Sequence, residues 1–471
     1  MLFNSIPFLI FFPIVTLLFY VIPHKYRWVL LLAASCFFYM FFVPKYILIL
    51  LITILIDYIA GIYIEKTEGK RRKFFLIVSI ISTCLVLVIF KYLGFFHQNM
   101  IALSHYFGFH YPDRIIHIIL PIGLSFHTFQ SLSYVIEVYR RNQKAEKHFG
   151  IYSLYVMFYP QLVTGPIERP QNLLRQLREV KIFQLDNLIR GFRLILFGLF
   201  VKMVIADNLA GYVDQIYENP SIFNSWSILI GLLFYSFQIY CDFFGYSTIA
   251  LGCALTMGYS ITNNFRTPYL SKNITEFWHR WHISLSSWFR DYVYFPMGGS
   301  RVKTMRWIFN IVVVFMLSGF WHGANWTFIF WGATFAFFYL IEYVCRKKIS
   351  LQFTGNNLIH NILNGISIVK NFILVTMIWV FFRSVDAKHI KLMYASIYHN
   401  FNLQDNFTID YKVWLFLALF IALDFILRKS RFDTWCGNQS FIVRWFIYAL
   451  LLFLILACSS VNSFPFIYFQ F

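Results

Sequence analysis

The feature that most constrains this chain is a series of apolar stretches close to or above the length that crosses a membrane. A helix needs about 20 apolar residues to cross a bilayer, and such stretches recur over residues 8–22, 46–64, 74–93 and 226–240. The chain is 59% hydrophobic and 13% charged, whereas a soluble domain carries about 25% charged residues. We therefore predict a membrane protein with roughly ten to twelve transmembrane segments.

The bilayer also restricts the secondary structure. Backbone polar groups in lipid must pair within the protein, and the alternating pattern of a membrane barrel is absent, so the predicted fold is all-α and polytopic. No Ser/Gly/Pro-rich linker divides the chain, and we expect one membrane domain over residues 1–471. The stretch from Met1 to Ile22 lacks a basic leading region and a cleavage site, which predicts a retained first span.

The net charge of +19 is distributed in short basic clusters between the apolar stretches. This distribution favours a topological role over nucleic-acid binding, because basic loops remain in the cytoplasm. The early clusters predict an N-terminus on the outside: Lys25 and Arg27; Lys66 and Lys70 to Lys73; Arg140, Arg141, Lys144 and Lys147. The clusters at residues 346–348 and 428–431 would also be cytoplasmic, where they could attract anionic lipid or the phosphates of a nucleotide donor.

The central region from Asn263 to Arg306 is more polar than its surroundings. It contains most of the side chains that could take part in a chemical reaction. We predict a helix that starts with Thr275 as its N-cap and ends before Pro296. The apolar stripe of this helix would suit the membrane interface or a funnel that enters the helix bundle. The stripe consists of Trp278, Trp281, Leu285, Trp288, Phe289 and Tyr292. His282 falls on this stripe and is expected to point inward.

A second histidine, His322, lies between two apolar runs in the sequence SGFWHGANW. An ionisable group near membrane depth is costly and marks a functional site by default. A neutral imidazole can take a proton from a hydroxyl that attacks an acyl carbon and then return it to the leaving group, so His322 is the predicted catalytic residue. His282 or Asn325 could position a reactant or donate to an oxyanion. The alternative is a His322 that only hydrogen-bonds a neighbouring helix.

Further polar and aromatic residues complete the predicted site. Asp242 either lines the site or pairs with a buried Lys or Arg, and Asp291 could make acceptor contacts or a structural contact. The residues predicted to bind substrate are Asn325, Trp321, Asp242, Gln238, Trp281 and Asp291. No metal site is expected, because His279 and His282 lack nearby Cys or carboxylate partners and the seven cysteines are scattered singly.

Six blocks of this sequence resemble the membrane-bound O-acyltransferase family, in particular its bacterial branch of alginate O-acetylation proteins. The blocks are LPIGLSFHTFQSLSY from Leu120, FYPQLVTGPIERP from Phe158, QIYCDFFGYSTIALG from Gln238, FWHRWHISLSSWFRDYVYFPMGGSR from Phe277, SGFWHGANWTFIFWG from Ser318 and PFIYFQF from Pro465. They span nearly the whole chain, and the motif-bearing core covers about residues 120–345.

The resemblance implies a curved ring of membrane helices, with re-entrant or interfacial helices and a central tunnel. It implies that His322 is the family's central histidine and His282 its second. Family members take an acyl group from a cytoplasmic thioester, such as acetyl-CoA, and need no permanently bound cofactor. The expected partners are a cell-surface polysaccharide, membrane lipid and a periplasmic or extracellular acyltransferase protein, and the expected location is the bacterial inner membrane.

Some alternatives remain open at this point. His279 and His127 stand where the family often has arginine and an aromatic residue, respectively, which puts donor or acceptor detail in doubt. The transferred group could be acetyl, which the alginate-like blocks favour, or D-alanyl. The acceptor could be alginate, peptidoglycan or another glycan. A transporter would show two related halves, whereas the polar blocks here occur once, and a non-catalytic scaffold would tolerate loss of both histidines.

Overall fold

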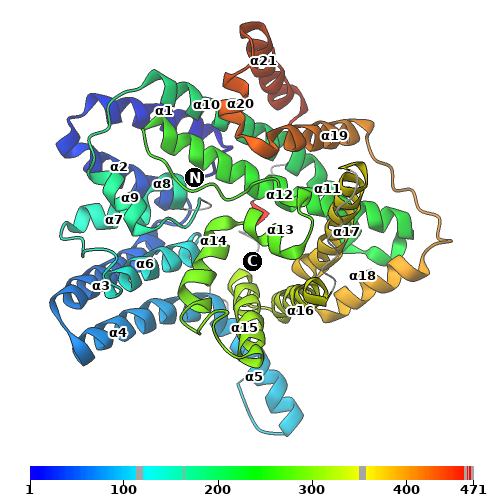
Figure 1. Ribbon diagram of the computed structural model, residues 1–471, viewed down its shortest axis with the longest axis horizontal. Coiled ribbons are helices and arrows are strands. Elements are labelled where there is room, and N and C mark those ends of the chain that lie inside the picture. The colour runs from blue at the N-terminus through cyan, green and yellow to red at the C-terminus, as the bar shows by residue number, and fades with distance from the viewer. Residues whose placement is uncertain (113–119, 163–164, 349–356, 461–463, 465, 468–471) are drawn as a thin grey trace. The chain divides into compact units, whose positions relative to one another are not determined.

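The computed structural model describes residues 1–112, 120–162, 165–348, 357–460, 464 and 466–467. Helices connected by short loops make up this part of the chain, and it contains no strand, which confirms the all-α fold (Figure 1). The helices form two compact units. Unit 1 comprises residues 1–195 and 249–262, and unit 2 comprises residues 196–248 and 263–471, as far as they are described.

Unit 1 is built from the N-terminal helices and parts of two long ones. Its complete helices are α1 (Ile6–Val21), α2 (His24–Met40), α3 (Ile47–Lys66), α4 (Gly69–Leu87), α5 (Leu93–Phe107), α6 (Leu124–Tyr139), α7 (Phe149–Met157), α8 (Tyr159–Leu162) and α9 (Pro170–Arg178). Helices α3, α4 and α6 pack against one another. The unit boundaries fall inside α10 (Leu185–Phe200) and α12 (Ser225–Thr256).

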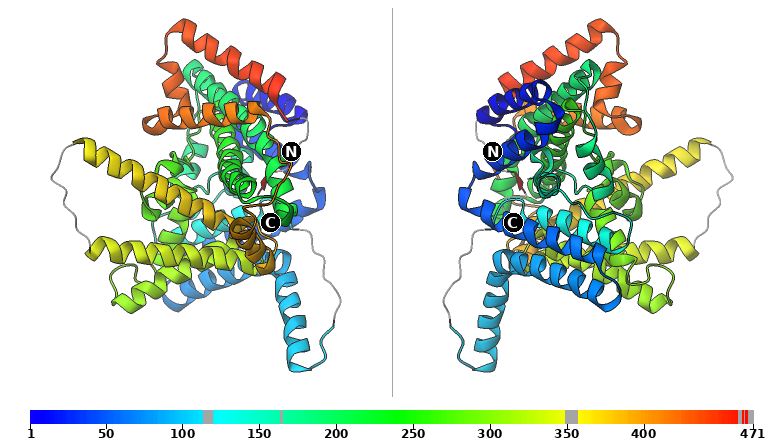
Figure 2. Two further views of the ribbon diagram at one scale, coloured as in Figure 1. Left: turned by 90° about the vertical axis from the view of Figure 1, so that its right-hand side faces the viewer. Right: turned by 90° about the vertical axis from the view of Figure 1, so that its left-hand side faces the viewer.

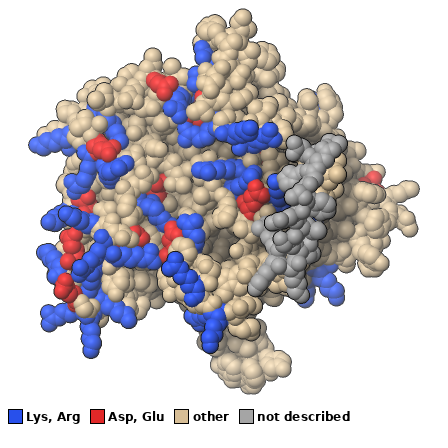
Figure 3. All heavy atoms as spheres, in the orientation of Figure 1, with Lys and Arg blue, Asp and Glu red and all other residues tan. Residues whose placement is uncertain are grey.

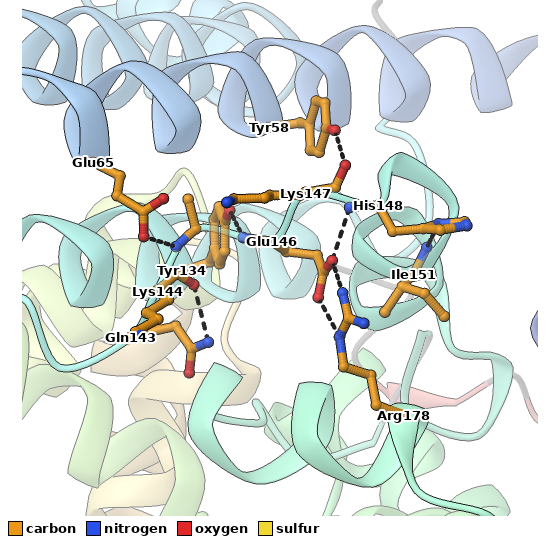
Figure 4. A network of polar contacts seen from close by, with 11 residues as sticks. Tyr58, Glu65, Tyr134, Gln143, Lys144, Glu146, Lys147, His148, Ile151 and Arg178 are labelled. Carbon is orange, nitrogen blue, oxygen red and sulfur yellow. Dashed lines mark hydrogen bonds and ion pairs between the residues drawn. The ribbon is translucent and has the colours of Figure 1, made fainter.

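A polar network fastens the loop between α6 and α7 within unit 1 (Figure 4). The Glu146 side chain is buried, pairs with Arg178 and accepts a hydrogen bond from the backbone N–H of His148 at 2.8 Å. The Tyr134 hydroxyl accepts from the backbone N–H of Glu146 at 2.9 Å, and Tyr58 donates to the carbonyl of Lys147 at 2.6 Å. Buried charge is tolerated here because it is both paired and hydrogen-bonded.

Unit 2 contains the predicted site. Its remaining helices are α11 (Asp207–Glu218), α13 (Ile274–Arg280), α14 (Ile283–Phe289), α15 (Thr304–His322), α16 (Trp326–Lys348), α17 (Asn357–Arg383), α18 (Ala387–His399), α19 (Tyr411–Ile426), α20 (Phe432–Gly437) and α21 (Phe441–Cys458). Short 3-10 and π-helical turns connect several of them, including the π turn η3 (Val201–Ala206) between α10 and α11.

Helices α15 and α16 form a tight antiparallel hairpin whose backbones approach closely at two glycines. A Cβ on Gly319 would lie 2.1 Å from the carbonyl oxygen of Phe328, and one on Gly332 would lie 2.2 Å from that of Phe315. Small residues allow membrane helices to pack at this distance. The hairpin thereby fixes the end of α15, where His322 lies.

Seven helices in the described part of the chain are long and apolar enough to cross a membrane, and α1 is a shorter apolar helix. These seven confirm a multi-pass membrane protein. The number is below the ten to twelve segments expected from the sequence, because Gly69–Phe107 is one continuous helical stretch of 39 residues and α1 has only 16 residues. Lys and Arg side chains occur in separate patches on the surface in Figure 3.

The predicted helix from Thr275 to Tyr292 is wrong in two respects. Its N-cap is Asn273, whose side chain accepts from the backbone N–H of Glu276 at 2.8 Å. The helix is also interrupted, because α13 ends at Arg280 and α14 begins at Ile283. Periodicity of apolar residues continues across the break and so could not reveal it.

Candidate active site

The break between α13 and α14 places His282 in a left-handed backbone conformation, with φ 43° and ψ 54°. Such a conformation is uncommon for a residue other than glycine and needs support from its surroundings. Asn264 supplies this support: its carbonyl accepts from the backbone N–H of Ile283 at 3.0 Å, and its side-chain oxygen accepts from that of Ser284 at 3.2 Å. The side chain of His282 therefore leaves the backbone in a different direction from the one that it would take in a continuous helix.

The His282 ring is completely buried against aromatic side chains. Its centroid lies 4.6 Å from that of Phe243 on α12 and 6.2 Å from that of Trp321 on α15. Burial penalises the charged imidazolium and lowers the pKa of His282 to about 3. The ring is therefore neutral at physiological pH, and one nitrogen can donate a hydrogen bond while the other accepts.

His322 is the last residue of α15 and is 4% exposed. Its ring centroid lies 4.9 Å from Trp321, 5.2 Å from Trp331 on α16 and 5.2 Å from Phe382 on α17. Three helices thus build an aromatic wall around one imidazole. Such a wall excludes water and strengthens any electrostatic interaction made inside it.

The structure brings the two histidines together, with ring centroids 6.5 Å apart and an interplanar angle of 61°. They come from the α13–α14 turn and from the end of α15, which are distant in sequence. This separation is short enough for one bound group to contact both rings. A proton acceptor and a neutral hydrogen-bond donor within reach of one group form an arrangement suited to acyl transfer.

Of the predicted substrate-binding residues, Asp242 is held in a buried ion cluster. One of its carboxylate oxygens lies 2.6 Å from the ammonium of Lys202, which is also 2.6 Å from Asp207, and the other accepts from the backbone N–H of Ile467 at 2.7 Å. This is the pairing alternative considered for Asp242. Its contact with substrate stays a prediction.

Trp321, by contrast, lies in the aromatic wall around His322, and Trp281 packs against a tryptophan of α17. Trp281 is 1% exposed and its ring centroid lies 5.1 Å from that of Trp379 on α17. Gln238 on α12 is also buried, and its side-chain carbonyl oxygen has no hydrogen-bond partner among the described residues. A buried acceptor of this kind is costly unless a ligand or water satisfies it.

Asn325 and Asp291 have identified structural partners. The side-chain oxygen of Asn325 accepts from the backbone N–H of Thr327 at 3.0 Å, at the start of α16, and its amide donates to the carbonyl of Val385 at 2.8 Å. Asp291 pairs with the half-exposed Arg290 at 2.9 Å. Asn325 thus joins the start of α16 to the segment after α17. The substrate contacts of Asn325 and Asp291 stay predictions.

The sequence did not single out Asn264, Phe243, Trp331 or Phe382 as site residues. Phe243, Trp331 and Phe382 sit inside apolar stretches, where nothing distinguishes a site-facing ring from a core ring. Asn264 carried a weak signal, since it is a polar residue in the segment before the predicted helix. No group of three His, Cys, Asp or Glu suited to a metal occurs among the described residues, and His279 is exposed whereas His282 is buried.

The fold and the histidine site define a class of protein: a multi-pass, all-α membrane protein with a buried pair of neighbouring imidazoles. A model of the membrane-bound O-acyltransferase family matches residues 147–383, a range that contains both histidines. The chain belongs to this family and is an O-acyltransferase.

Individual relatives are similar over much of the chain. The probable alginate O-acetylase of Pseudomonas aeruginosa is 36% identical over 405 residues, which cover 84% of this chain and 75% of the relative. The peptidoglycan O-acetyltransferase of Helicobacter pylori is 35% identical over 331 residues, 64% of this chain and 62% of the relative. The teichoic acid D-alanyltransferase of Bacillus subtilis is 30% identical over 285 residues, 57% of this chain and 68% of the relative.

Proposed function

We propose that this protein transfers an acetyl group from a cytoplasmic acyl thioester, such as acetyl-CoA, toward a hydroxyl of a cell-envelope polysaccharide. The names of the relatives support a polymer acceptor, since they refer to alginate, peptidoglycan and teichoic acid. Acetyl is favoured over D-alanyl because the alginate O-acetylase aligns over more of the chain and at higher identity than the D-alanyltransferase. A bacterial inner membrane is the matching location.

The observation that carries the mechanism is the pair of buried imidazoles, His322 and His282, at 6.5 Å between ring centroids. In the proposed step, His322 accepts the proton of the attacking hydroxyl as its oxygen bonds to the acyl carbon. The carbon–sulfur bond then breaks, and the proton passes from His322 to the departing sulfur. General acid–base catalysis of this kind contributes about 10²–10⁴-fold in rate.

His282 acts in this proposal as a neutral hydrogen-bond donor to the oxyanion that forms on the acyl oxygen. The low pKa produced by burial keeps the ring uncharged, so it stabilises developing negative charge without itself exchanging the proton. The Asn264-supported turn fixes its direction. The same step serves a hydroxyl of the polysaccharide itself and a hydroxyl of a periplasmic or extracellular partner protein that passes the acyl group on.

The test is the O-acetyl content of each surface glycan in cells that produce wild type, His322→Ala, His282→Ala or His279→Ala at equal membrane abundance. His279 is the matched control, because it is an exposed histidine on the adjoining helix α13. Loss of acetyl from one glycan in the His322 and His282 variants alone supports the proposal and names the acceptor. Unchanged acetylation in the His322 variant contradicts it, and loss of ester-linked D-alanine in place of acetyl would identify the other acyl group.

A further inference from the structure

Unit 1 contains a small basic pocket, which lies where the start of α2, the start of α7 and the end of α9 meet. Its volume is about 190 Å³. The basic residues that line it are His24, Lys25, Arg27, His148 and Arg178, and no Asp or Glu of the described chain does so. The pocket lies wholly within unit 1, whereas both histidines of the proposed catalytic site belong to unit 2.

Two cations of the basic pocket have no carboxylate partner. Arg27 donates to the backbone carbonyl of Ile22 at 3.0 Å and to that of Lys181, and both acceptors are neutral. Lys25 is exposed, and its ammonium lies 5.6 Å from the ring centroid of Tyr26. Neither cation forms an ion pair within the part of the chain that the structure describes. Both positive charges are therefore available to an anion.

A third cation of the basic pocket is partly compensated. Arg178 extends from α9 to the buried carboxylate of Glu146, with which it pairs (Figure 4). Its side chain is nevertheless 54% exposed and contributes to the lining. After this pairing, the charges of Lys25 and Arg27 still leave the pocket with an excess of positive charge.

The first turn of α2 adds to this excess. Pro23 is the N-cap of the helix, no side chain caps the free N–H groups, and no acidic residue lies in the first turn. A helix N-terminus carries partial positive charge and favours an anion. The positions of His24, Lys25 and Arg27 at this end are therefore unfavourable unless an anion compensates them.

Three basic segments meet at the end of unit 1 that contains the pocket. Arg141 pairs with Glu68 at 3.1 Å, which joins the loop after α6 to the loop after α3, and the ring of His148 lies 4.7 Å from that of Trp28 at the start of α2. Helices α3, α4 and α6 accordingly lie side by side in the right-hand view of Figure 2.

The composition of these segments indicates the side of the membrane on which the pocket lies. In residues 24–28, 65–73 and 140–148 the cations are Lys25, Arg27, Lys66, Lys70, Arg71, Arg72, Lys73, Arg140, Arg141, Lys144 and Lys147, and the acidic residues are Glu65, Glu68 and Glu146. Segments with such an excess of Lys and Arg stay in the cytoplasm. The basic pocket thus faces the cytoplasmic leaflet, whose anionic lipids attract basic side chains.

The size and walls of the pocket favour a lipid headgroup over a nucleotide thioester. A site that encloses a whole small molecule has a volume of about 300–1,000 Å³, so this smaller pocket accommodates a phosphate group but not a whole nucleotide. Trp28 and Tyr259 form part of its walls, and such rings favour the headgroup level of a membrane. Val21 and Ile182, which adjoin the two residues whose carbonyls Arg27 contacts, are 71% and 74% exposed and offer apolar surface to acyl chains.

We propose that the basic pocket binds the phosphate of an anionic phospholipid from the cytoplasmic leaflet, with Lys25 and Arg27 as the cations that hold it. Ammonium and guanidinium groups donate charge-assisted hydrogen bonds to phosphate oxygens. A zwitterionic lipid carries its own cation beside the phosphate and gains less from the pocket. The inference does not rest on the proposed acyl transfer.

The experiment measures the binding of radiolabelled short-chain lipids to the purified full-length protein in a non-ionic detergent. The probes are dioctanoyl phosphatidylglycerol, which is anionic, and dioctanoyl phosphatidylcholine, which is zwitterionic. The variants are Lys25→Gln, Lys25→Arg, Arg27→Gln and the matched control Lys70→Gln. Lys70 is matched because it is an exposed lysine in the first turn of α4, at the same end of unit 1, and does not line the pocket.

We expect the phosphatidylglycerol to bind at least about tenfold more tightly than the phosphatidylcholine, since two cations act on its net charge. Lys25→Gln and Arg27→Gln should each lower the affinity for phosphatidylglycerol about fivefold. Lys25→Arg and Lys70→Gln should bind as wild type does. Equal binding of the two lipids, or unchanged binding by Lys25→Gln or Arg27→Gln, overturns the inference. Equal weakening by Lys25→Gln and Lys70→Gln overturns it as well, because the general charge of this end then explains the attraction.

Competition separates a lipid from other sources of phosphate. Unlabelled coenzyme A or inorganic phosphate is added to wild type that holds the labelled phosphatidylglycerol. Neither should displace the lipid at an equal concentration, because neither brings acyl chains to the apolar surface beside Arg27. Displacement by coenzyme A would assign the pocket to nucleotide phosphates, and displacement by inorganic phosphate would assign it to a free anion. Either result overturns the lipid assignment.

Discussion

The ammonium of Lys202 lies 2.6 Å from a carboxylate oxygen of Asp242, and both side chains are almost inaccessible to solvent. Lys202 lies in the turn η3 and Asp242 in α12, so the pair joins two segments of unit 2. Asp207 lies at the same distance from Lys202. One buried cation thus compensates two buried carboxylates, and Asp242 directly precedes Phe243, whose ring contacts His282.

Removal of this cation is expected to be strongly destabilising. Lys202→Met keeps much of the side-chain volume but leaves Asp207 and Asp242 buried without their counter-ion, and breaking such a pair costs about 3–5 kcal/mol. Thermal unfolding in detergent measures the effect. The control is Arg290→Met at the half-exposed pair with Asp291, where about 0–1 kcal/mol is expected. Equal stability of the two variants would show that the buried cluster does not hold the fold.

The close approach of α15 and α16 gives a prediction for Gly319→Ala. The added Cβ would meet the carbonyl of Phe328 at 2.1 Å, so the helices must separate and His322 must move. We expect a loss of about 1–3 kcal/mol in stability, together with at least about a tenfold loss of acyl transfer, since small displacements of a catalytic group are costly. Unfolding curves and transfer rates measure the two effects.

The matched control for that variant is Gly365→Ala on α17. A Cβ at Gly365 meets no atom within 4 Å, and alanine favours the helix by about 0.5–1 kcal/mol over glycine. Stability should therefore be unchanged or slightly higher, with full activity. If Gly319→Ala behaves in the same way, the helix approach is not what positions His322.

The buried state of His282 predicts a dependence of stability on pH. Because burial lowers its pKa from about 6.5 to about 3, the unfolded chain binds a proton between these values while the folded protein does not. Stability is therefore full above about pH 7 and falls as the pH decreases, by about 2 kcal/mol at pH 5. His282→Asn, which tolerates the left-handed backbone, should remove this part of the acid sensitivity. The measurement is the difference in unfolding free energy between pH 7 and pH 5 for both proteins.

A result in which wild type and His282→Asn lose equal stability between these pH values would show that the ring is not held neutral by burial. The control is His279→Asn, which replaces an exposed histidine on the adjoining helix α13. It should retain the wild-type pH dependence.

Much of the fold was predictable from the sequence because the bilayer dictates it. Long apolar stretches indicate helices whatever their neighbours are, and His322 was identifiable as a polar residue between two such stretches. The turn at His282 was not predictable, because its backbone conformation depends on Asn264, which precedes it by a loop and a helix. The ion pair between Asp242 and Lys202 was equally unpredictable, because it depends on how α12 packs against η3.

The last prediction concerns Asn264, which we expect to matter more for activity than for stability. In Asn264→Ala the backbone N–H of Ser284 loses its side-chain acceptor, and the left-handed turn at His282 loses part of its support. The comparison variant is Asn273→Ala, which removes the same type of side-chain cap from the opposite end of α13. Each change should cost about 1 kcal/mol of stability.

The two asparagine variants should differ in their rates of acyl transfer at saturating donor. Asn264→Ala is expected to lower the rate by about tenfold or more, because His282 is free to reorient away from the developing oxyanion. Asn273→Ala leaves the turn and both histidines in place and should retain most of its rate. Similar rates for the two variants at similar stability would mean that the direction of His282 is set by its aromatic neighbours and not by the turn.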